Sequence, residues 1–138
     1  MSRNSEIPIA GGLDVALPKM ATAHQRFNAT HISDVEQAVL TQMSRPEISA
    51  RVTSGMTVAI GAGSRGVANI DTAVRATVQA LRERGAEPFI FPAMGSHAGA
   101  TAEGQQALLA GYGITEDGVG APVRASMDTV QIAEMADG

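Results

Sequence analysis

Apolar and polar positions alternate most clearly in the middle of the chain. Residues 56–60 (MTVAI) are short, β-branched and apolar, as is typical of a strand covered on both faces. Residues 70–81 carry apolar side chains at i, i+3, i+4, i+8 and i+11, which predicts an amphipathic helix. Asn69 is the candidate N-cap of this helix, and Gly85 suits the left-handed residue that ends one. Residues 88–91 then predict a second strand.

The patterns on either side of this segment are weaker. Residues 101–111 predict a further helix, with Leu108 and Leu109 on its apolar side. Residues 122–125 and 129–133 indicate two more short strands.

The first third of the chain predicts a strand and two short helices. Residues 20–27 alternate weakly, which favours a strand. Ser33 begins a capping-box pattern (SDVE), in which we expect it to cap a helix that runs to Met43. Pro46 then begins a second short helix.

The order of elements from residue 56 onward is strand, helix, strand, helix, strand. This order predicts an α/β fold with an open, Rossmann-like, mostly parallel sheet, right-handed crossovers and flanking helices. We expect residues 1–55 to supply an N-terminal arm, a strand and capping helices. Residues 56–138 would form the βαβαβ core of the same single domain.

Composition narrows the class of protein. A chain of 138 residues with a net charge of −4 and no Lys/Arg cluster does not favour a nucleic-acid surface. The absence of Cys excludes disulfides and thiolate metal sites. The sequence contains neither a signal-peptide apolar region nor a run of about 18 apolar residues, so we expect a cytoplasmic protein with no membrane partner.

Two loops of small residues follow the two central strands, and each holds one chemically versatile side chain. Residues 61–66 (GAGSRG) contain Arg65, and the stretch 89–101 (FIFPAMGSHAGAT) contains His97. Ligands of open parallel sheets bind at the carboxyl ends of the strands, so we expect Arg65 and His97 to face one crevice. Arg65 would bind a carboxylate or phosphate through its guanidinium fork, and His97 would act as a general acid/base.

Other chemistries are not favoured by these residues. Ser64 does not stand in a GxSxG elbow, so a nucleophilic Ser/His/Asp triad is not expected. There is no HExxH motif, no pair of His residues at helical spacing and no carboxylate cluster, so no complete metal site is predicted. A solvated Arg65 and a structural His97 remain the plain alternatives, and we expect His24 and His31 to be surface or strand residues.

Two segments of the sequence resemble the N-terminal domain of the nickel-dependent lactate racemase family, in its racemase-like branch. They read TVAIGAGSRGVANI and RERGAEPFIFPAMGSHAGATAEGQ, and the resemblance extends over residues 56–115. The earlier stretch LPKM…QRF…ISDVEQAV is also similar to this branch. The resemblance covers well over half the chain, and its most specific part is the Gly-Ser-His-x-Gly-Ala-Thr-x-Glu-Gly-Gln run.

The resemblance implies roles for individual residues of both loops. The family's first loop has an Asp-His-Thr-Arg-Pro pattern that binds cofactor and substrate, and Ser64 and Arg65 match its Thr and Arg. Ala62 and Gly63 stand where the family has Asp and His, so the contacts of that Asp are missing. The family's second loop has a Gly-Thr-His pattern with a catalytic His, which His97 matches. The binding residues implied by the resemblance are Gly63, Ser64, Arg65, Gly95 and Ser96.

The resemblance also implies a cofactor and a larger protein. The family fold has two α/β domains, with a nickel-pincer nucleotide between them that is tethered to a lysine and bound by histidine. Those residues and the second acid/base histidine follow the matching region in the family, and the one lysine here, Lys19, precedes it. We therefore expect this chain, which ends at Gly138 in mid-domain, to be the N-terminal portion of such a protein and inactive by itself.

Two functional hypotheses from different classes remain. The first is part of a 2-hydroxyacid racemase or epimerase, acting by proton and hydride transfer at C2 of a small 2-hydroxyacid or other carboxylate. The second is a non-catalytic carboxylate- or phosphate-binding module or remnant, which Ala62 and Gly63 favour. Self-association through an exposed strand edge is a further expectation. The sequence does not specify the substrate, the use of nickel or the oligomeric state.

Overall fold

The computed structural model describes residues 19–28 and 30–134, and the chain divides into two units, Met1–Thr30 and His31–Gly138. In the first unit, residues 19–28 and Thr30 are exposed and belong to no helix or strand. The strand predicted at residues 20–27 is therefore wrong. Weak alternation did not suffice, because a strand also needs a neighbouring strand to pair its backbone groups.

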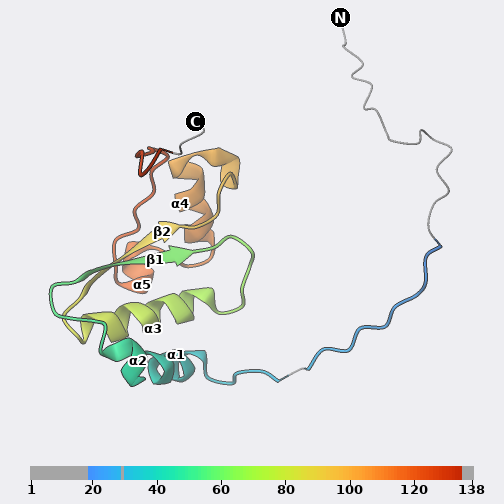
Figure 1. The fold of residues 1–138 in the computed structure, drawn as a ribbon, viewed down its shortest axis with the longest axis horizontal. Helices are drawn as coiled ribbons and strands as arrows, with labels where there is room; N and C mark the ends of the chain where they lie inside the picture. Colours follow the sequence, from blue (N-terminus) through green and yellow to red (C-terminus); the bar gives the residue numbers. More distant parts are fainter. Residues whose placement is uncertain (1–18, 29, 135–138) are drawn as a thin grey trace, which may run out of the picture. The chain divides into compact units, whose positions relative to one another are not determined.

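The second unit contains all the regular elements of the described residues (Figure 1). In chain order they are α1 (Val35–Met43), α2 (Pro46–Ser49), β1 (Thr57–Ala62), α3 (Ile70–Arg82), β2 (Glu87–Pro92), the short turn η2 (Ala98–Ala100), α4 (Ala102–Gly111) and α5 (Glu116–Val119).

Strands β1 and β2 form a two-stranded parallel sheet, with Thr57 opposite Glu87 at one end and Ala62 opposite Pro92 at the other. Helix α3 makes the connection between them, as the sequence predicted. The predicted strand at residues 122–125 is reduced to a single parallel bridge between Val123 and Ile90. The architecture is thus mixed α/β, with flanking helices around a small parallel sheet.

The strand predicted at residues 129–133 is also wrong. Val130 and Ile132, which would have formed its apolar side, are 82% and 93% exposed. Nothing in the described part of the chain covers them, so alternation again did not produce a strand.

The sheet is covered on one face only, which corrects the expectation that residues 56–60 are covered on both faces. Val58, Ile60 and Ala62 of β1 are half-buried or buried, whereas the alternate residues Thr57, Ala59 and Gly61 are exposed. The buried core lies on the covered side and consists of Ala62, Val74, Val78, Ile90, Met94, Leu109, Ile114, Val119 and Ala121.

Helix α3 supplies most of the cover, and the helices at the start of the unit lie beyond it (Figure 1). Its buried residues are Val74, Ala76, Val78, Ala80 and Leu81. Helix α1 packs against α3, where Arg75 approaches Glu36 to 3.6 Å. Arg84, just after α3, donates a 3.2 Å hydrogen bond to the carbonyl of Met43 at the end of α1.

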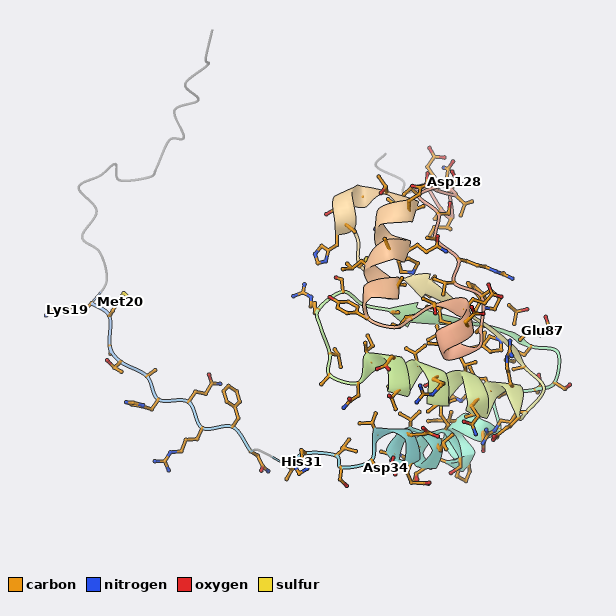
Figure 2. The ribbon with its side chains drawn as sticks, turned by 180° about the vertical axis from the view of Figure 1, so that it is seen from behind. Lys19, Met20, His31, Asp34, Glu87 and Asp128 are labelled. Carbon is orange, nitrogen blue, oxygen red and sulfur yellow. The ribbon has the colours of Figure 1, made fainter. Side chains whose placement is uncertain are left out.

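The helix ends agree with the sequence prediction except at two caps, those of α1 and α3. Asp34 rather than Ser33 caps α1, because its carboxylate accepts a 2.8 Å bond from the amide of Gln37 (Figure 2). Asn69 does precede α3, but its backbone is left-handed (φ 56°) and its side chain makes no capping bond. Gly85 has φ +77° and follows α3 as predicted.

The last two helices begin at threonine caps. Thr101 accepts a hydrogen bond from the amide of Gly104, which starts the predicted helix α4. Thr115 accepts from Gly118 in the same way and starts α5, a helix of four residues that the sequence pattern did not predict. A helix this short has no full apolar period to detect.

A tight contact joins the first turn of α4 to η2. Ala98, Gly99 and Ala100 all have positive φ, which turns the chain sharply after His97. The carbonyl oxygen of Ala98 consequently points at Gly104, where an added Cβ would overlap it and would also lie 2.8 Å from the Thr101 hydroxyl oxygen. Only glycine fits at residue 104 without a shift of this turn.

We therefore expect Gly104→Ala to lower the free energy of unfolding by about 1–3 kcal/mol, as overpacking does. Gly111→Ala is the matched control in the same helix, since its Cβ would meet nothing within 4 Å. Its higher helix propensity should raise stability by up to about 1 kcal/mol. Urea denaturation of both variants checks this, and equal stability of the two would contradict the described contact.

Candidate functional site

Two loops leave the sheet at the same edge and define the candidate site. The pairing of β1 and β2 continues one residue beyond the strands, where the amide of Ala93 donates a 2.8 Å bond to the carbonyl of Ala62. The loops that follow therefore start side by side. One leads to Ser64 and Arg65, and the other leads to His97.

These loops line one pocket of about 390 Å³. Its lining residues are Gly63, Ser64, Arg65, Val67, Ile70, Ala93, Met94 and His97. Arg65 and His97 thus share a pocket, as the strand order predicted. Gly95 and Ser96, the other predicted binding residues, belong to the second loop but do not line the pocket.

The direct contact between the loops is made by Ser64, not by Arg65. The hydroxyl of Ser64 lies 2.5 Å from Nδ1 of His97, within hydrogen-bond distance across 33 residues of sequence. Either group can be the donor, depending on which ring nitrogen carries the proton. The contact occupies Nδ1 and leaves Nε2 of the exposed imidazole for a ligand.

Two polar side chains, Gln105 in α4 and Tyr112 directly after it, contact the two loops. The hydroxyl of Tyr112 donates a 3.0 Å hydrogen bond to the carbonyl of Ser64. The amide of Gln105 donates to the carbonyl of Gly95 at 2.6 Å and approaches that of His97 at 3.5 Å. Gln105 is only 4% exposed and is the one buried polar residue among the described residues. These bonds fix the separation of the loops.

Sequence reasoning missed Gln105 and Tyr112. Gln105, Leu108, Leu109 and Tyr112 are spaced i, i+3, i+4 and i+7, which places them on one face of a helix. Gln105 and Tyr112 therefore lie on the same inward side as the two leucines. A polar residue on an apolar stripe was the available signal, together with the fact that Tyr112 is the only tyrosine of the chain. Such a residue needs a hydrogen-bond partner when buried.

The pocket offers positive charge and free donors. Arg65 is exposed and makes no ion pair or side-chain hydrogen bond with any described residue. Ile70, the first residue of the 13-residue helix α3, also lines the pocket, so the positive end of the helix dipole lies beside it. A guanidinium, a helix N-terminus and an imidazole together suit a small anion with a group that can exchange a proton.

The described residues do not supply a metal centre. Within residues 19–28 and 30–134, no group of three or more His, Cys, Asp or Glu side chains could hold a metal ion. The pocket itself provides one imidazole and no carboxylate or lysine. The lysine tether and nickel ligands of a nickel-pincer nucleotide therefore do not fit onto these residues.

None of the helices in the described ranges has the length and apolar character needed to cross a membrane. The longest of them, α3, has 13 residues and carries charged side chains on its outer side.

Comparisons with protein-family models, with curated proteins and with solved structures found no match to this chain.

If Gln105 positions the second loop, Gln105→Met should change the environment of His97. It should not leave a cavity, because Met has a similar side-chain volume. We expect a loss of about 0.5–1.5 kcal/mol in the free energy of unfolding, the usual effect of one lost hydrogen bond. The ring NMR signals of His97 should shift in the same variant.

Glu103→Met is the control, since Glu103 is an exposed residue of the same helix that makes no side-chain hydrogen bond or ion pair with the described residues. Unchanged His97 signals in Gln105→Met would remove Gln105 from this role.

Proposed function

We propose that the chain is the N-terminal part of a 2-hydroxyacid racemase or epimerase that resembles lactate racemase. The observation that supports the proposal best is that Ser64 contacts His97 across the two loops. Both residues line the same pocket as Arg65. An Arg fork beside an imidazole matches a substrate with a carboxylate and a neighbouring hydroxyl group.

In this proposal Arg65 binds the substrate carboxylate through paired N–H donors. Nε2 of His97 then faces the C2 hydroxyl group and takes or returns its proton. Ser64 holds the opposite ring nitrogen and so orients the imidazole. Inverting C2 also requires that its hydrogen leave as a hydride and return on the other face, where a second acid/base group would serve the hydroxyl. We assign the hydride acceptor and that second group to a longer protein, within a larger Rossmann-like sheet.

The resemblance adds a nickel-pincer nucleotide to this proposal. The described residues provide neither its lysine tether nor its nickel ligands. The part that we assign to this chain is therefore limited to carboxylate binding and to the proton carried by His97.

The second candidate is a non-catalytic module that binds a carboxylate or phosphate. Ala62 and Gly63 support it, because neither can make the side-chain contacts expected of an Asp-His pair at this point of the loop. In that case Arg65 would be needed for binding, and His97 would serve only to hold the loop.

The first test of the proposal is binding by the 138-residue chain. Titration with L-lactate should shift the NMR signals of both loops, and Arg65→Gln should weaken binding about tenfold or more, because a charge-assisted hydrogen bond is lost. Arg51→Gln, at another exposed arginine, is the control.

The second test separates catalysis from binding. In a longer protein that contains this chain and its cofactor, His97→Ala should lower the rate of racemisation by about 10²–10⁴-fold, the usual contribution of a positioned acid/base. His24→Ala, at an exposed histidine of the first unit, should leave the rate unchanged. A loss below tenfold in His97→Ala, with lactate binding intact, would favour the binding module.

A further inference from the structure

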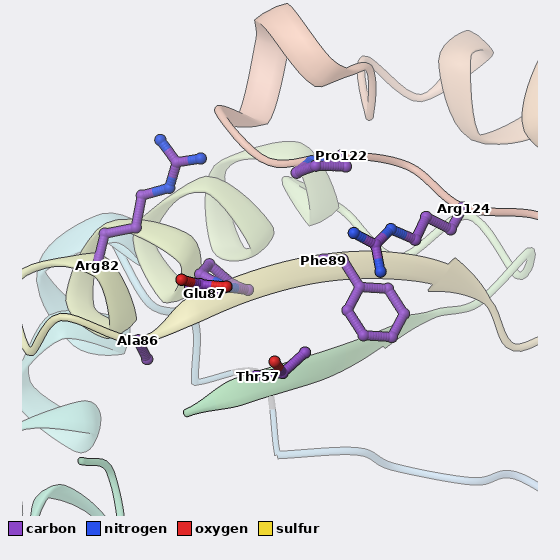
Figure 3. A pocket seen from close by; sticks show the side chains of 8 residues that line it. Thr57, Arg82, Ala86, Glu87, Phe89, Pro122 and Arg124 are labelled. Atoms are coloured by element: carbon purple, nitrogen blue, oxygen red, sulfur yellow. The ribbon is translucent and has the colours of Figure 1, made fainter. Parts of the chain in front are cut away.

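A second pocket lies at the opposite end of the sheet, and we propose that it binds a small ligand with one phosphate or carboxylate group. The pocket has a volume of about 390 Å³ (Figure 3). Its lining residues are Thr57, Arg82, Ala86, Glu87, Pro88, Phe89, Pro122 and Arg124.

The pocket is separate from the first one. Thr57 and Glu87 are the first residues of β1 and β2, whereas Ser64 and His97 follow the last residues of these strands. A strand of six residues spans about 17 Å, so one small ligand cannot contact both pockets. We therefore expect the two pockets to bind ligands independently of each other.

Two arginines approach this pocket from different elements. Arg82 projects from the last turn of α3, and Arg124 follows the bridge residue Val123 (Figure 3). Neither forms an ion pair or a side-chain hydrogen bond with a described residue, in contrast to Arg75, which pairs with Glu36. Each guanidinium carries five N–H donors, so this end of the sheet presents many donors with no protein acceptor.

Arg124 is also held in place. Its guanidinium carbon lies 4.7 Å from the centroid of the Phe89 ring, a cation–π arrangement. Stacking restricts the side chain before any ligand binds, so less conformational entropy is lost on binding. A stacked guanidinium still directs its N–H groups outward in the plane, where an anion can accept from them.

Glu87 limits the charge of the ligand. It lines the same pocket, and Figure 3 shows it between Arg82 and Arg124, but it lies beyond 4.0 Å from both guanidinium groups. Two arginines and one glutamate leave a net charge of about +1 in the pocket. This favours a ligand with a single anionic group over one with several.

The remaining walls suit an apolar ligand body. Pro88 is buried, Phe89 is half-buried and Pro122 is half-buried, and all three present carbon atoms to the pocket. A small aryl or alkyl ester of phosphate, or a carboxylate of similar size, has this combination of one charged group and one apolar part.

The test is a titration of the 138-residue chain with phenyl phosphate, followed by backbone amide NMR signals. We expect saturable shifts at Glu87, Phe89 and Arg124. Arg124→Gln should weaken this binding about tenfold, since a charge-assisted hydrogen bond is lost. Glu87→Gln should strengthen it about two- to fivefold, because a nearby like charge is removed.

Two controls distinguish binding at this pocket from binding at the first pocket and from non-specific binding. Arg65→Gln should leave the shifts at Glu87 and Arg124 unchanged, and phenol, which lacks the anionic group, should produce none. Thermal unfolding of Arg124→Gln checks that the fold persists, and Arg82→Gln provides a second variant if it does not. The proposal is overturned if these amides show no saturable shift, if Glu87→Gln weakens binding, or if the shifts disappear with Arg65→Gln.

Discussion

The parallel pairing of β1 with β2 is the constraint on which the candidate site depends. Ala62 lies opposite Pro92, and the Ala93 amide extends the pairing to the carbonyl of Ala62. Loops that follow paired parallel strands leave at one edge, so two segments more than thirty residues apart in sequence begin as neighbours. The same pairing places the opposite ends of both strands together, where the second pocket forms. Each end of this small sheet thus gathers side chains from separate elements.

All the predicted helices formed, because each has a local cause in its apolar stripe or its end residues. Helix α3 has a complete apolar stripe and Gly85 after its end, so its bounds were predictable from residues 70–85 alone. The strands predicted at 20–27 and 129–133 did not form, because a strand depends on a partner that local alternation does not reveal. The exposed face of β1 was missed for a related reason, since a short apolar run does not show whether one face or two are covered.

The sequence predicted which loops would share the candidate site, but it did not predict which side chains would contact each other there. Strand order brought Arg65 and His97 to one pocket, but which side chain meets the imidazole depends on the direction of each Cβ after the strand has ended. Ser64 is adjacent to Arg65 in sequence and points to His97 instead. The supports from Gln105 and Tyr112 were missed because they come from a third element, whose packing sequence spacing alone does not specify.

The central claim is that the Ser64–His97 contact joins the two loops into one site, and a double-mutant cycle measures it directly. Unfolding free energies of the wild-type chain, Ser64→Ala, His97→Ala and the double variant give the coupling between the two side chains. A hydrogen bond at 2.5 Å predicts a coupling of about 0.5–1.5 kcal/mol. Strictly additive effects, with a coupling near zero, would show that the two loops are not joined through this pair and would contradict the account.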